Sequence, residues 1–304
     1  MENKNFDFDV TLDVMTVGGV QYTPEDRLGC GAFGTVFKGR DSDQSTVAIK
    51  HQYIRPDNSR AQILEEYRIH KDMSEVDKAG SVIKMIGMLK NPKSVIMVLE
   101  FAPESLHSIL GKVTSVQTQK YFRQLIHGVE FLHSNHVAHC DLSLKNLLLL
   151  EGNLKIADFG RAKRLMSKDQ EFLSTECRGT PKFCAPEVCA REPVPVKPFS
   201  LYVWSSGVVL MQLTQNSEDS WREAKVQVQE YDKWVAKKKP TGSDFWYNIP
   251  PAVMNLLRKI LEADISKRAT IIEIKNSPYF KKDEKEPIKR SGAATRSSGK
   301  RARY

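Results

Sequence analysis

The sequence HCDLSLKN occupies residues 139–146, and DFG follows it at residues 158–160. Upstream lie the glycine-rich sequence GCGAFGTV at residues 29–36 and VAIK at residues 47–50, and downstream APE occupies residues 185–187. Each of these strings can occur by chance. All five, in this order and at these separations, predict a single site assembled from segments that lie far apart in the chain.

The patterns around the glycine-rich sequence predict a small sheet with one helix. Asp41-Ser42-Asp43 supplies turn chemistry between two of the expected strands, as a hairpin requires. Four β-like runs precede residue 101. One leads into Gly29, and the others cover residues 35–39, 46–52 and 95–100. One helical pattern covers residues 61–73.

After Pro103 the periodicity becomes helical. Apolar residues recur every three or four positions from Tyr121 to Leu132, which predicts one apolar face on a long helix. Residues 199–213 are apolar nearly all round, which predicts a buried helix. Pro251 suits the first turn of a further helix that extends to Leu261.

These patterns predict an α+β fold with two lobes. No internal repeat interrupts this organisation. We expect a lead-in at residues 1–21, a small antiparallel β-rich N-lobe at about 22–100, a hinge at about 100–105, a larger mainly helical C-lobe at about 106–282 and a basic disordered tail at 283–304.

Much of the net charge belongs to the C-terminal segment. The chain has 304 residues and a net charge of +9, and residues 281–304 contain nine lysines and arginines but three acids, which gives +6. We therefore expect no direct nucleic-acid site in the folded body. The tail is either a nuclear import signal, which favours the nucleus over the cytoplasm, or a solvated charged end.

The remaining composition favours a non-secreted protein without a membrane span. No apolar run is long enough to cross a bilayer, and residues 1–9 lack the apolar core of a secretory signal. The five cysteines show neither a C-x-x-C pair nor zinc-type spacing, so we expect reduced thiols.

The glycine-rich sequence and VAIK are suited to binding phosphates. Gly29, Gly31 and Gly34 allow the backbone to lie close to phosphate oxygens, and Lys50 offers a positive charge to them. A plain hairpin turn is the alternative for the glycines. Lys50 needs a carboxylate partner, and the following helix offers two neighbouring candidates, Glu65 and Glu66.

The second pair of motifs is suited to proton and metal chemistry. Asp141 can accept the proton of a substrate hydroxyl, while Asn146 and Asp158 can bind a metal ion that bridges phosphates. An isolated DFG would more simply be a turn. Its position after Asp141, with Asn146 between them, favours the functional interpretation.

Together these motifs resemble the eukaryotic protein kinases over residues 22–282. The resemblance implies a monomeric kinase domain that uses ATP and Mg²⁺ to phosphorylate protein substrates. Thr180 in the sequence Gly179-Thr180-Pro181 is typical of the serine/threonine branch. Arg268 matches the arginine that pairs with the glutamate of the APE sequence, here Glu187. Residues 230–234, 256–261 and 267–271 are similar to the C-lobe of the checkpoint kinase 1 group, which implies nuclear DNA-damage and cell-cycle signalling.

The resemblance also implies the residues around the nucleotide, and it favours Glu66 over Glu65 as the partner of Lys50. Glu100 and Ala102 offer backbone groups to adenine at the hinge. The full set expected to bind ATP is Leu28, Gly29, Cys30, Gly31, Ala32, Phe33, Gly34, Thr35, Val36, Ala48, Lys50, Glu66, Glu100, Ala102 and Leu148.

Four positions depart from the family pattern. Cys140 stands where the family usually has the arginine that clamps a phosphorylated activation loop, so we expect activity independent of phosphate on that loop. Ser143 replaces a lysine that contacts the γ-phosphate, and Lys145 is either its substitute or a surface lysine. Tyr202 replaces an aspartate that accepts hydrogen bonds from the catalytic loop, and a phenol accepts more weakly.

Two functions therefore remain open. Lys50, Asp141, Asn146 and Asp158 are all present, which favours a working serine/threonine kinase. The replacements at residues 140, 143 and 202 motivate the alternative, a pseudokinase that binds nucleotide and partner proteins with little or no phosphotransfer.

Overall fold

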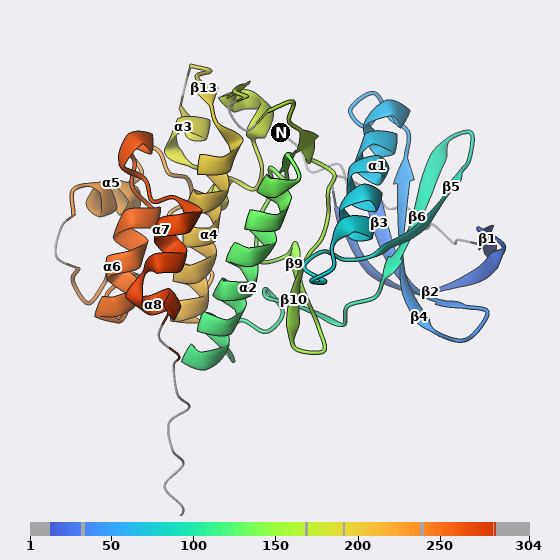
Figure 1. Cartoon of the computed structure of the whole chain (residues 1–304), viewed down its shortest axis with the longest axis horizontal. Helices are drawn as coiled ribbons and strands as arrows, with labels where there is room; N and C mark the ends of the chain where they lie inside the picture. Colours follow the sequence, from blue (N-terminus) through green and yellow to red (C-terminus); the bar gives the residue numbers. More distant parts are fainter. Residues whose placement is uncertain are drawn as a thin grey trace, which may run out of the picture.

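The computed structural model describes residues 13–31, 34–167, 170–190, 192–237, 240–281 and 283. The chain forms two lobes, with a sheet and one long helix on the right of Figure 1 and the remaining helices on the left. This is the two-lobed arrangement that the sequence predicts.

The N-lobe is an antiparallel sheet of six strands in the order β1-β2-β3-β4-β6-β5, packed against one helix. Strands β2, β3, β4 and β6 and helix α1 agree with the expected runs, whereas the sequence did not predict β5. The elements are β1 (Met15–Val17), β2 (Val20–Gly31), β3 (Gly34–Asp41), β4 (Thr46–Tyr53), α1 (Arg60–Val76), β5 (Met85–Lys90) and β6 (Ser94–Glu100).

Strand β1 lies within the segment for which the sequence predicts only a loose lead-in. It pairs with β2 from Met15 opposite Tyr22 to Val17 opposite Val20. Met15 and Val17 are buried and Thr16 between them is exposed, so the alternation that identifies a half-buried strand is present. It spans only three residues, which is too short for a sequence pattern to distinguish.

Local chemistry fixes the turns and helix starts that frame the site. The Asp41 carboxylate accepts the backbone N–H groups of Asp43 and Ser45 at 3.0 and 2.8 Å, which closes the β3–β4 turn as predicted. Helix α1 begins with a capping box in which Ser59 and Gln62 satisfy each other's backbone N–H groups. The side chains of α1 are therefore held in a fixed register over the sheet.

The C-lobe is built around two of its own long helices, α2 and α4, which lie side by side in Figure 1. Helix α4 is buried around most of its circumference, as its apolar sequence predicts. The elements are β7 (Glu104–Ser105), α2 (Ser115–Ser134), β8 (Val137–Ala138), β9 (Leu147–Leu150), β10 (Asn153–Ile156), β11 (Lys163–Arg164), β12 (Phe172–Leu173), η1 (Ser174–Cys177), η2 (Pro181–Phe183), α3 (Pro186–Cys189), β13 (Pro195–Val196), α4 (Pro198–Gln215), α5 (Gln229–Val235), α6 (Pro251–Ile260), η3 (Ile265–Lys267), α7 (Ile271–Asn276) and α8 (Pro278–Lys281).

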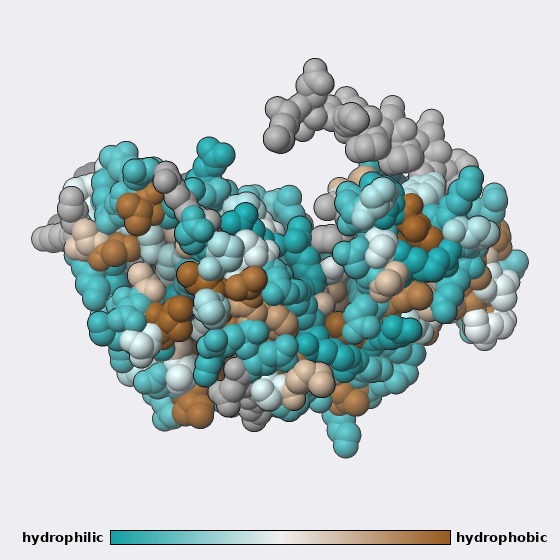
Figure 2. Space-filling model, turned by 90° about the horizontal axis from the view of Figure 1, so that it is seen from above, coloured by the Kyte–Doolittle hydropathy of each residue, from teal (hydrophilic) through white to brown (hydrophobic). Residues whose placement is uncertain are grey.

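The buried apolar side chains of the described residues form three clusters, which are the cores of the two lobes. The largest fills the C-lobe and also includes Ile69 and Met73 of α1, while two smaller cores lie on the two faces of the N-lobe sheet. Seen from above in Figure 2, a hollow separates the larger lobe from the smaller one, and the visible surface is mainly hydrophilic. No helix in the described ranges is both long enough and apolar enough to span a bilayer.

Candidate active site

A cavity of about 790 Å³ lies between the lobes, and both lobes line it. Most residues that the sequence nominates for the site reach it. They are Leu28, Gly29, Cys30, Gly31, Gly34, Val36, Ala48, Lys50, Glu66, Glu100, Ala102, Asp141, Lys145, Asn146, Leu148, Asp158 and Thr180.

One residue expected at the nucleotide, Thr35, is described but is not part of this lining. Thr35 is buried and its hydroxyl faces the Cys30 sulfur at 3.6 Å, so its side chain points within the strand pair and not into the cavity. Ala32 and Phe33, at the tip of the glycine-rich sequence, lie outside the described residues.

Gly34 has to be a glycine because of its backbone geometry. Its φ of +131° is one that side-chain-bearing residues rarely adopt. A Cβ at this position would lie 2.2 Å from the carbonyl oxygen of His51 on the neighbouring strand. The glycine-rich sequence can therefore fold tightly over the cavity only in the absence of a side chain here.

Lys50 is the centre of an ion triad that joins the lobes. Its Nζ lies 2.6 Å from Glu66 Oε1 of α1 and 2.8 Å from Asp158 Oδ1 of the DFG sequence. Burial alone would lower the pKa of Lys50, but the charges of both carboxylates and their hydrogen bonds outweigh it and raise that pKa. Lys50 is therefore a permanent cation aimed at the cavity.

The structure pairs Lys50 with Glu66 and not with Glu65. Glu65 is half-exposed and lies near Arg68, at 3.5 Å, on the outer side of α1. The second oxygen of Glu66 accepts a hydrogen bond from Gln52 Nε2 at 2.8 Å, a contact that sequence reasoning missed. Gln52 lies two residues after Lys50 and so shares its face of β4, which is the signal that could have identified it.

Asp158 and Asn146 present oxygen atoms suited to a divalent cation. Burial would raise the pKa of Asp158, but the Lys50 charge and hydrogen bond lower it, so the carboxylate is ionised. Asn146 donates from Nδ2 to the Asp141 carbonyl at 2.8 Å, which leaves its amide oxygen to act as a ligand. Asp158 has a φ of +63°, the kind of strained geometry that is common at functional sites.

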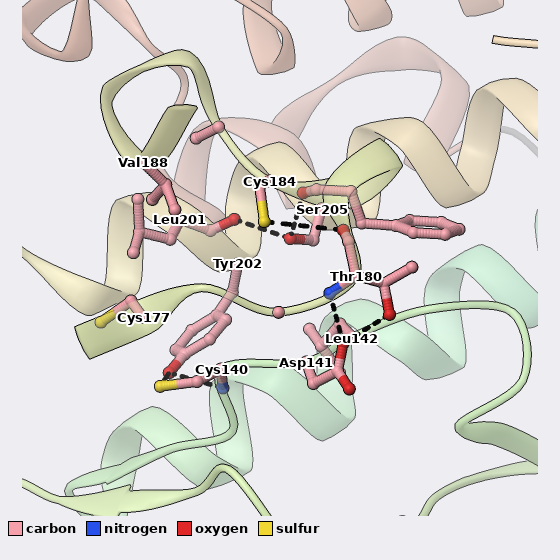
Figure 3. A pocket seen from close by; sticks show the side chains of 13 residues that line it. Cys140, Asp141, Leu142, Cys177, Thr180, Cys184, Val188, Leu201, Tyr202 and Ser205 are labelled. Carbon is pink, nitrogen blue, oxygen red and sulfur yellow. Dashed lines mark hydrogen bonds between the residues drawn. The ribbon is translucent and has the colours of Figure 1, made fainter. Parts of the chain in front are cut away.

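Asp141 is held by the segment that leads into APE. Its Oδ1 accepts hydrogen bonds from both the backbone N–H and the hydroxyl of Thr180, each at 2.8 Å (Figure 3). Gly179 permits this approach, because a Cβ there would lie 2.5 Å from the Cys140 carbonyl oxygen. The segment from DFG to APE, residues 161–187, is called the activation segment below.

An aromatic stack fixes the DFG sequence. Phe159 is fully buried, with its ring 4.5 Å from that of His70 on α1 and 5.1 Å from that of His139. His70 Nε2 lies 2.7 Å from the Ile83 carbonyl oxygen and His139 Nε2 lies 3.0 Å from that of Ala157, so both neutral rings donate from Nε2. Burial lowers the pKa of His70 to about 4, although the Ile83 hydrogen bond opposes this.

His70 was another residue that sequence reasoning missed. It follows Glu66 by four positions, which places both side chains on one helix face. That spacing could have nominated it once Glu66 was chosen.

Tyr202 substitutes for the expected carboxylate as an acceptor. Its buried phenol oxygen accepts the backbone N–H of Cys140 at 3.3 Å, a long hydrogen bond, and lies 3.7 Å from the Cys140 sulfur (Figure 3). Cys140 itself has a φ of +60°. The residue before Asp141 is therefore held in a strained backbone geometry by one neutral acceptor from α4.

Glu187 and Arg268 form a buried bidentate ion pair away from the cavity. Arg268 Nη1 and Nη2 lie 2.6 and 2.9 Å from the two carboxylate oxygens, and Arg268 Nε donates to the Glu262 carbonyl at 2.9 Å. The fork geometry of arginine suits this contact. The pair fastens the end of the activation segment to the helices of the C-lobe.

Lys145 and Ser143 differ in their environment. Lys145 is exposed and lines the cavity next to Asp141 and Asn146. Ser143 is buried, and its carbonyl oxygen accepts the backbone N–H of Asn146 at 3.1 Å. The serine thus shapes the loop, while a positive charge at the cavity comes from Lys145.

Comparison with known proteins agrees with this geometry. The family model described as "Protein kinase domain" matches residues 22–280. Serine/threonine-protein kinase chk-1 of Caenorhabditis elegans is 34% identical over 265 residues, which cover 83% of this chain and 51% of that protein. CBL-interacting protein kinase 11 of Oryza sativa subsp. japonica is 31% identical over 288 residues, which cover 91% and 55%.

The chk-1 protein of Caenorhabditis briggsae is 32% identical over 262 residues, which cover 83% of this chain and 52% of that protein. The chain thus spans about half the length of the curated relatives it matches. The family match covers most of the chain, and it agrees with the ion triad and with the loops around Asp141 and Asp158. The relatives named chk-1 are serine/threonine-protein kinases by name, and this chain belongs to the protein kinase family.

Proposed function

We propose that this protein is an active kinase that transfers the γ-phosphoryl group of ATP to serine or threonine of protein substrates. The observation that carries the proposal is the assembled triad of Lys50, Glu66 and Asp158, with contacts of 2.6 and 2.8 Å. An intact triad places the cation of the N-lobe against the metal-binding carboxylate of the C-lobe. Phosphoryl transfer depends on this positioning and charge neutralisation.

The protein kinase domain implies ATP and a divalent metal in general, and we propose Mg²⁺ as that metal. The residues present fit both groups, because Asp158 and Asn146 supply oxygen ligands and the cavity would accommodate a nucleotide. The metal-bound nucleotide supplies the reactive phosphoryl group. Lys50 and the backbone N–H groups of Gly29 to Gly34 would bind its phosphates, and Asn146 and Asp158 would hold the metal.

Asp141 would orient the substrate hydroxyl and accept its proton. Its Oδ1 already accepts two hydrogen bonds from Thr180, which would fix the plane of the carboxylate. The second oxygen, Oδ2, would then accept the proton of the substrate hydroxyl. Lys145, exposed beside Asp141, would bind the transferred phosphate in place of the lysine that Ser143 replaces. Leu28, Val36, Ala48 and Leu148 would enclose adenine, with backbone groups of Glu100 and Ala102 at the hinge.

The proposed kinase would not need phosphate on its activation segment. Cys140 cannot clamp a phosphate, because it carries no positive charge. Ser174, one of the candidate acceptors, is buried, and its hydroxyl accepts the Val194 backbone N–H at 3.2 Å. A phosphate there would disrupt this contact and would not strengthen it.

The test of the proposed activity is direct. Purified protein is incubated with labelled ATP, Mg²⁺ and a generic basic protein, beside an Asp141→Asn variant. Incorporation well above the variant supports the kinase, and incorporation equal to the variant refutes it. Calorimetric titration of ATP with Mg²⁺ into both proteins shows separately whether the nucleotide site is functional.

A pseudokinase scaffold is the second candidate, and the Tyr202 contact is the observation in its favour. A neutral oxygen at 3.3 Å holds the Cys140 backbone where a carboxylate would hold it more firmly, and a looser catalytic loop lowers the rate without removing the nucleotide site. Binding of ATP in the calorimeter with no phosphate transfer would identify this function.

We also propose a role in nuclear DNA-damage or cell-cycle checkpoint signalling, by a monomeric protein without direct nucleic-acid binding in its folded body. The similarity to proteins named serine/threonine-protein kinase chk-1 supports this role, and the basic sequence of residues 281–304 supports nuclear import. A fluorescent reporter fused to residues 281–304 that stays in the cytoplasm would contradict the import signal.

A further inference from the structure

Two buried thiols lie near the point where the activation segment meets the loop that carries Asp141. Cys140 directly precedes Asp141, and Cys177 ends η1 in the activation segment. They are 8% and 4% exposed and belong to the same apolar core. Both residues line one small cavity together with Tyr202 (Figure 3).

The backbone on both sides of this pair is fixed. Thr180 holds Asp141 through two hydrogen bonds of 2.8 Å, and Gly179 lies against the Cys140 carbonyl without room for a Cβ. The Cys140 backbone N–H is bound by Tyr202. Segments that are distant in sequence are thus brought together next to the proposed catalytic aspartate, with a sulfur atom on each side.

The two thiols differ in their ease of ionisation. The interaction with Cys140, aided by the charge of Lys163, lowers the pKa of Cys177 although burial opposes it. The interaction with Cys177 and burial raise the pKa of Cys140. A thiol with a lowered pKa beside a thiol with a raised pKa is the arrangement of an attacking and a resolving cysteine.

We propose that Cys140 and Cys177 form a reversible disulfide when the protein meets a peroxide, and that this bond ties the activation segment to the catalytic loop. The Cys177 thiolate attacks one peroxide oxygen, the O–O bond breaks and hydroxide leaves, which gives a sulfenic acid. The Cys140 sulfur then attacks the Cys177 sulfur, the S–O bond breaks and water leaves. Overall, two thiols and one hydrogen peroxide give one disulfide and two waters, and a dithiol reverses the reaction.

This bond would perform covalently what a phosphate and an arginine do ionically in related kinases. It joins the residue before Asp141 to a residue three positions before Thr180. The inference does not rest on phosphotransfer, because the bond can form in an inactive protein.

A second pair of thiols provides an internal comparison. The Cys189 thiol donates to the Cys184 carbonyl at 4.0 Å, and the Cys184 thiol donates to the Thr180 carbonyl at 3.5 Å. Trypsin separates the two pairs, since Cys184 and Cys189 fall in the single peptide 183–191. Cys140 falls in the peptide 124–145 and Cys177 in the peptide 169–178.

The test uses the protein of 304 residues. Reduced protein is treated with hydrogen peroxide, alkylated, digested with trypsin without reduction and analysed by mass spectrometry. We expect the linked peptides 124–145 and 169–178, which disappear after dithiothreitol. Hydrogen exchange of residues 171–180 should slow about tenfold in the oxidised protein, because a disulfide suppresses local opening.

Three variants make the test specific. Cys177→Ser and Cys140→Ser should each abolish the linked peptides and the slower exchange, while Cys189→Ser should retain both. Circular dichroism establishes that each variant is folded. The proposal is overturned if oxidised wild-type protein links Cys184 to Cys189 but not Cys140 to Cys177. Unchanged exchange in a protein that contains the Cys140–Cys177 bond overturns the proposed tether.

Discussion

Acidification should destabilise this protein through His70, whose ring packs on Phe159 of the DFG sequence. Burial lowers the pKa of His70 to about 4 from an ordinary value of 6.5. Between these two values the unfolded chain binds the proton more readily than the folded one, so the free energy of unfolding falls as the pH falls. From pH 7 to pH 5 the contribution of His70 is about 2 kcal/mol.

The measurement compares thermal unfolding of wild-type protein and His70→Gln, without nucleotide, at pH 7 and pH 5. Glutamine does not titrate, and its amide can still donate to the Ile83 carbonyl. A loss of about 2 kcal/mol corresponds to about 4 °C in a domain of this size. The wild-type midpoint should therefore fall about 4 °C more than that of the variant over this interval.

A matched variant shows whether the difference is specific to the buried ring. His127 is exposed on α2, and His127→Gln should keep the full pH dependence of the wild type. Equal acid shifts in wild-type protein and His70→Gln would refute the reasoning, because the buried ring would then contribute nothing to the pH dependence.

Three substitutions test other contacts of the site. Glu66→Gln leaves the buried Lys50 with one carboxylate fewer and should lower the free energy of unfolding by roughly 3 kcal/mol in chemical denaturation; a loss under about 1 kcal/mol would contradict the geometry of the triad. Tyr202→Phe removes the acceptor of the Cys140 N–H and should cost about 1 to 2 kcal/mol by the same measurement, whereas a neutral result would mean that the bond contributes no stability. Gly34→Ala should weaken ATP binding about tenfold or more in calorimetry, because its Cβ would overlap the neighbouring strand, and unchanged affinity would show that the loop position is irrelevant to binding.

The sequence predicted the local elements because their signals are local. The turn at Asp41-Ser42-Asp43, the apolar face of α2 and the buried helix α4 each follow from residues within one element. Strand β1 escaped prediction, since three residues carry no usable period and its stability comes from pairing with β2.

The chemical groups of the site also follow from the sequence. The spacing of the five motifs nominated the lysine, the two aspartates and the asparagine that the fold gathers around one cavity. Sequence alone could not decide between two adjacent glutamates, because the choice depends on the rotation of α1 over the sheet. Packing turns Glu66 inward and Glu65 outward.

The sequence by itself determined which residues are candidates for the proposed chemistry, because side-chain type and order are properties of the sequence. Only the tertiary structure decided which groups hold them: Gln52 on Glu66, Thr180 on Asp141, and the Tyr202 phenol on the Cys140 backbone. These partners come from different segments, and their distances depend on how the two lobes and the activation segment pack, which no local pattern encodes.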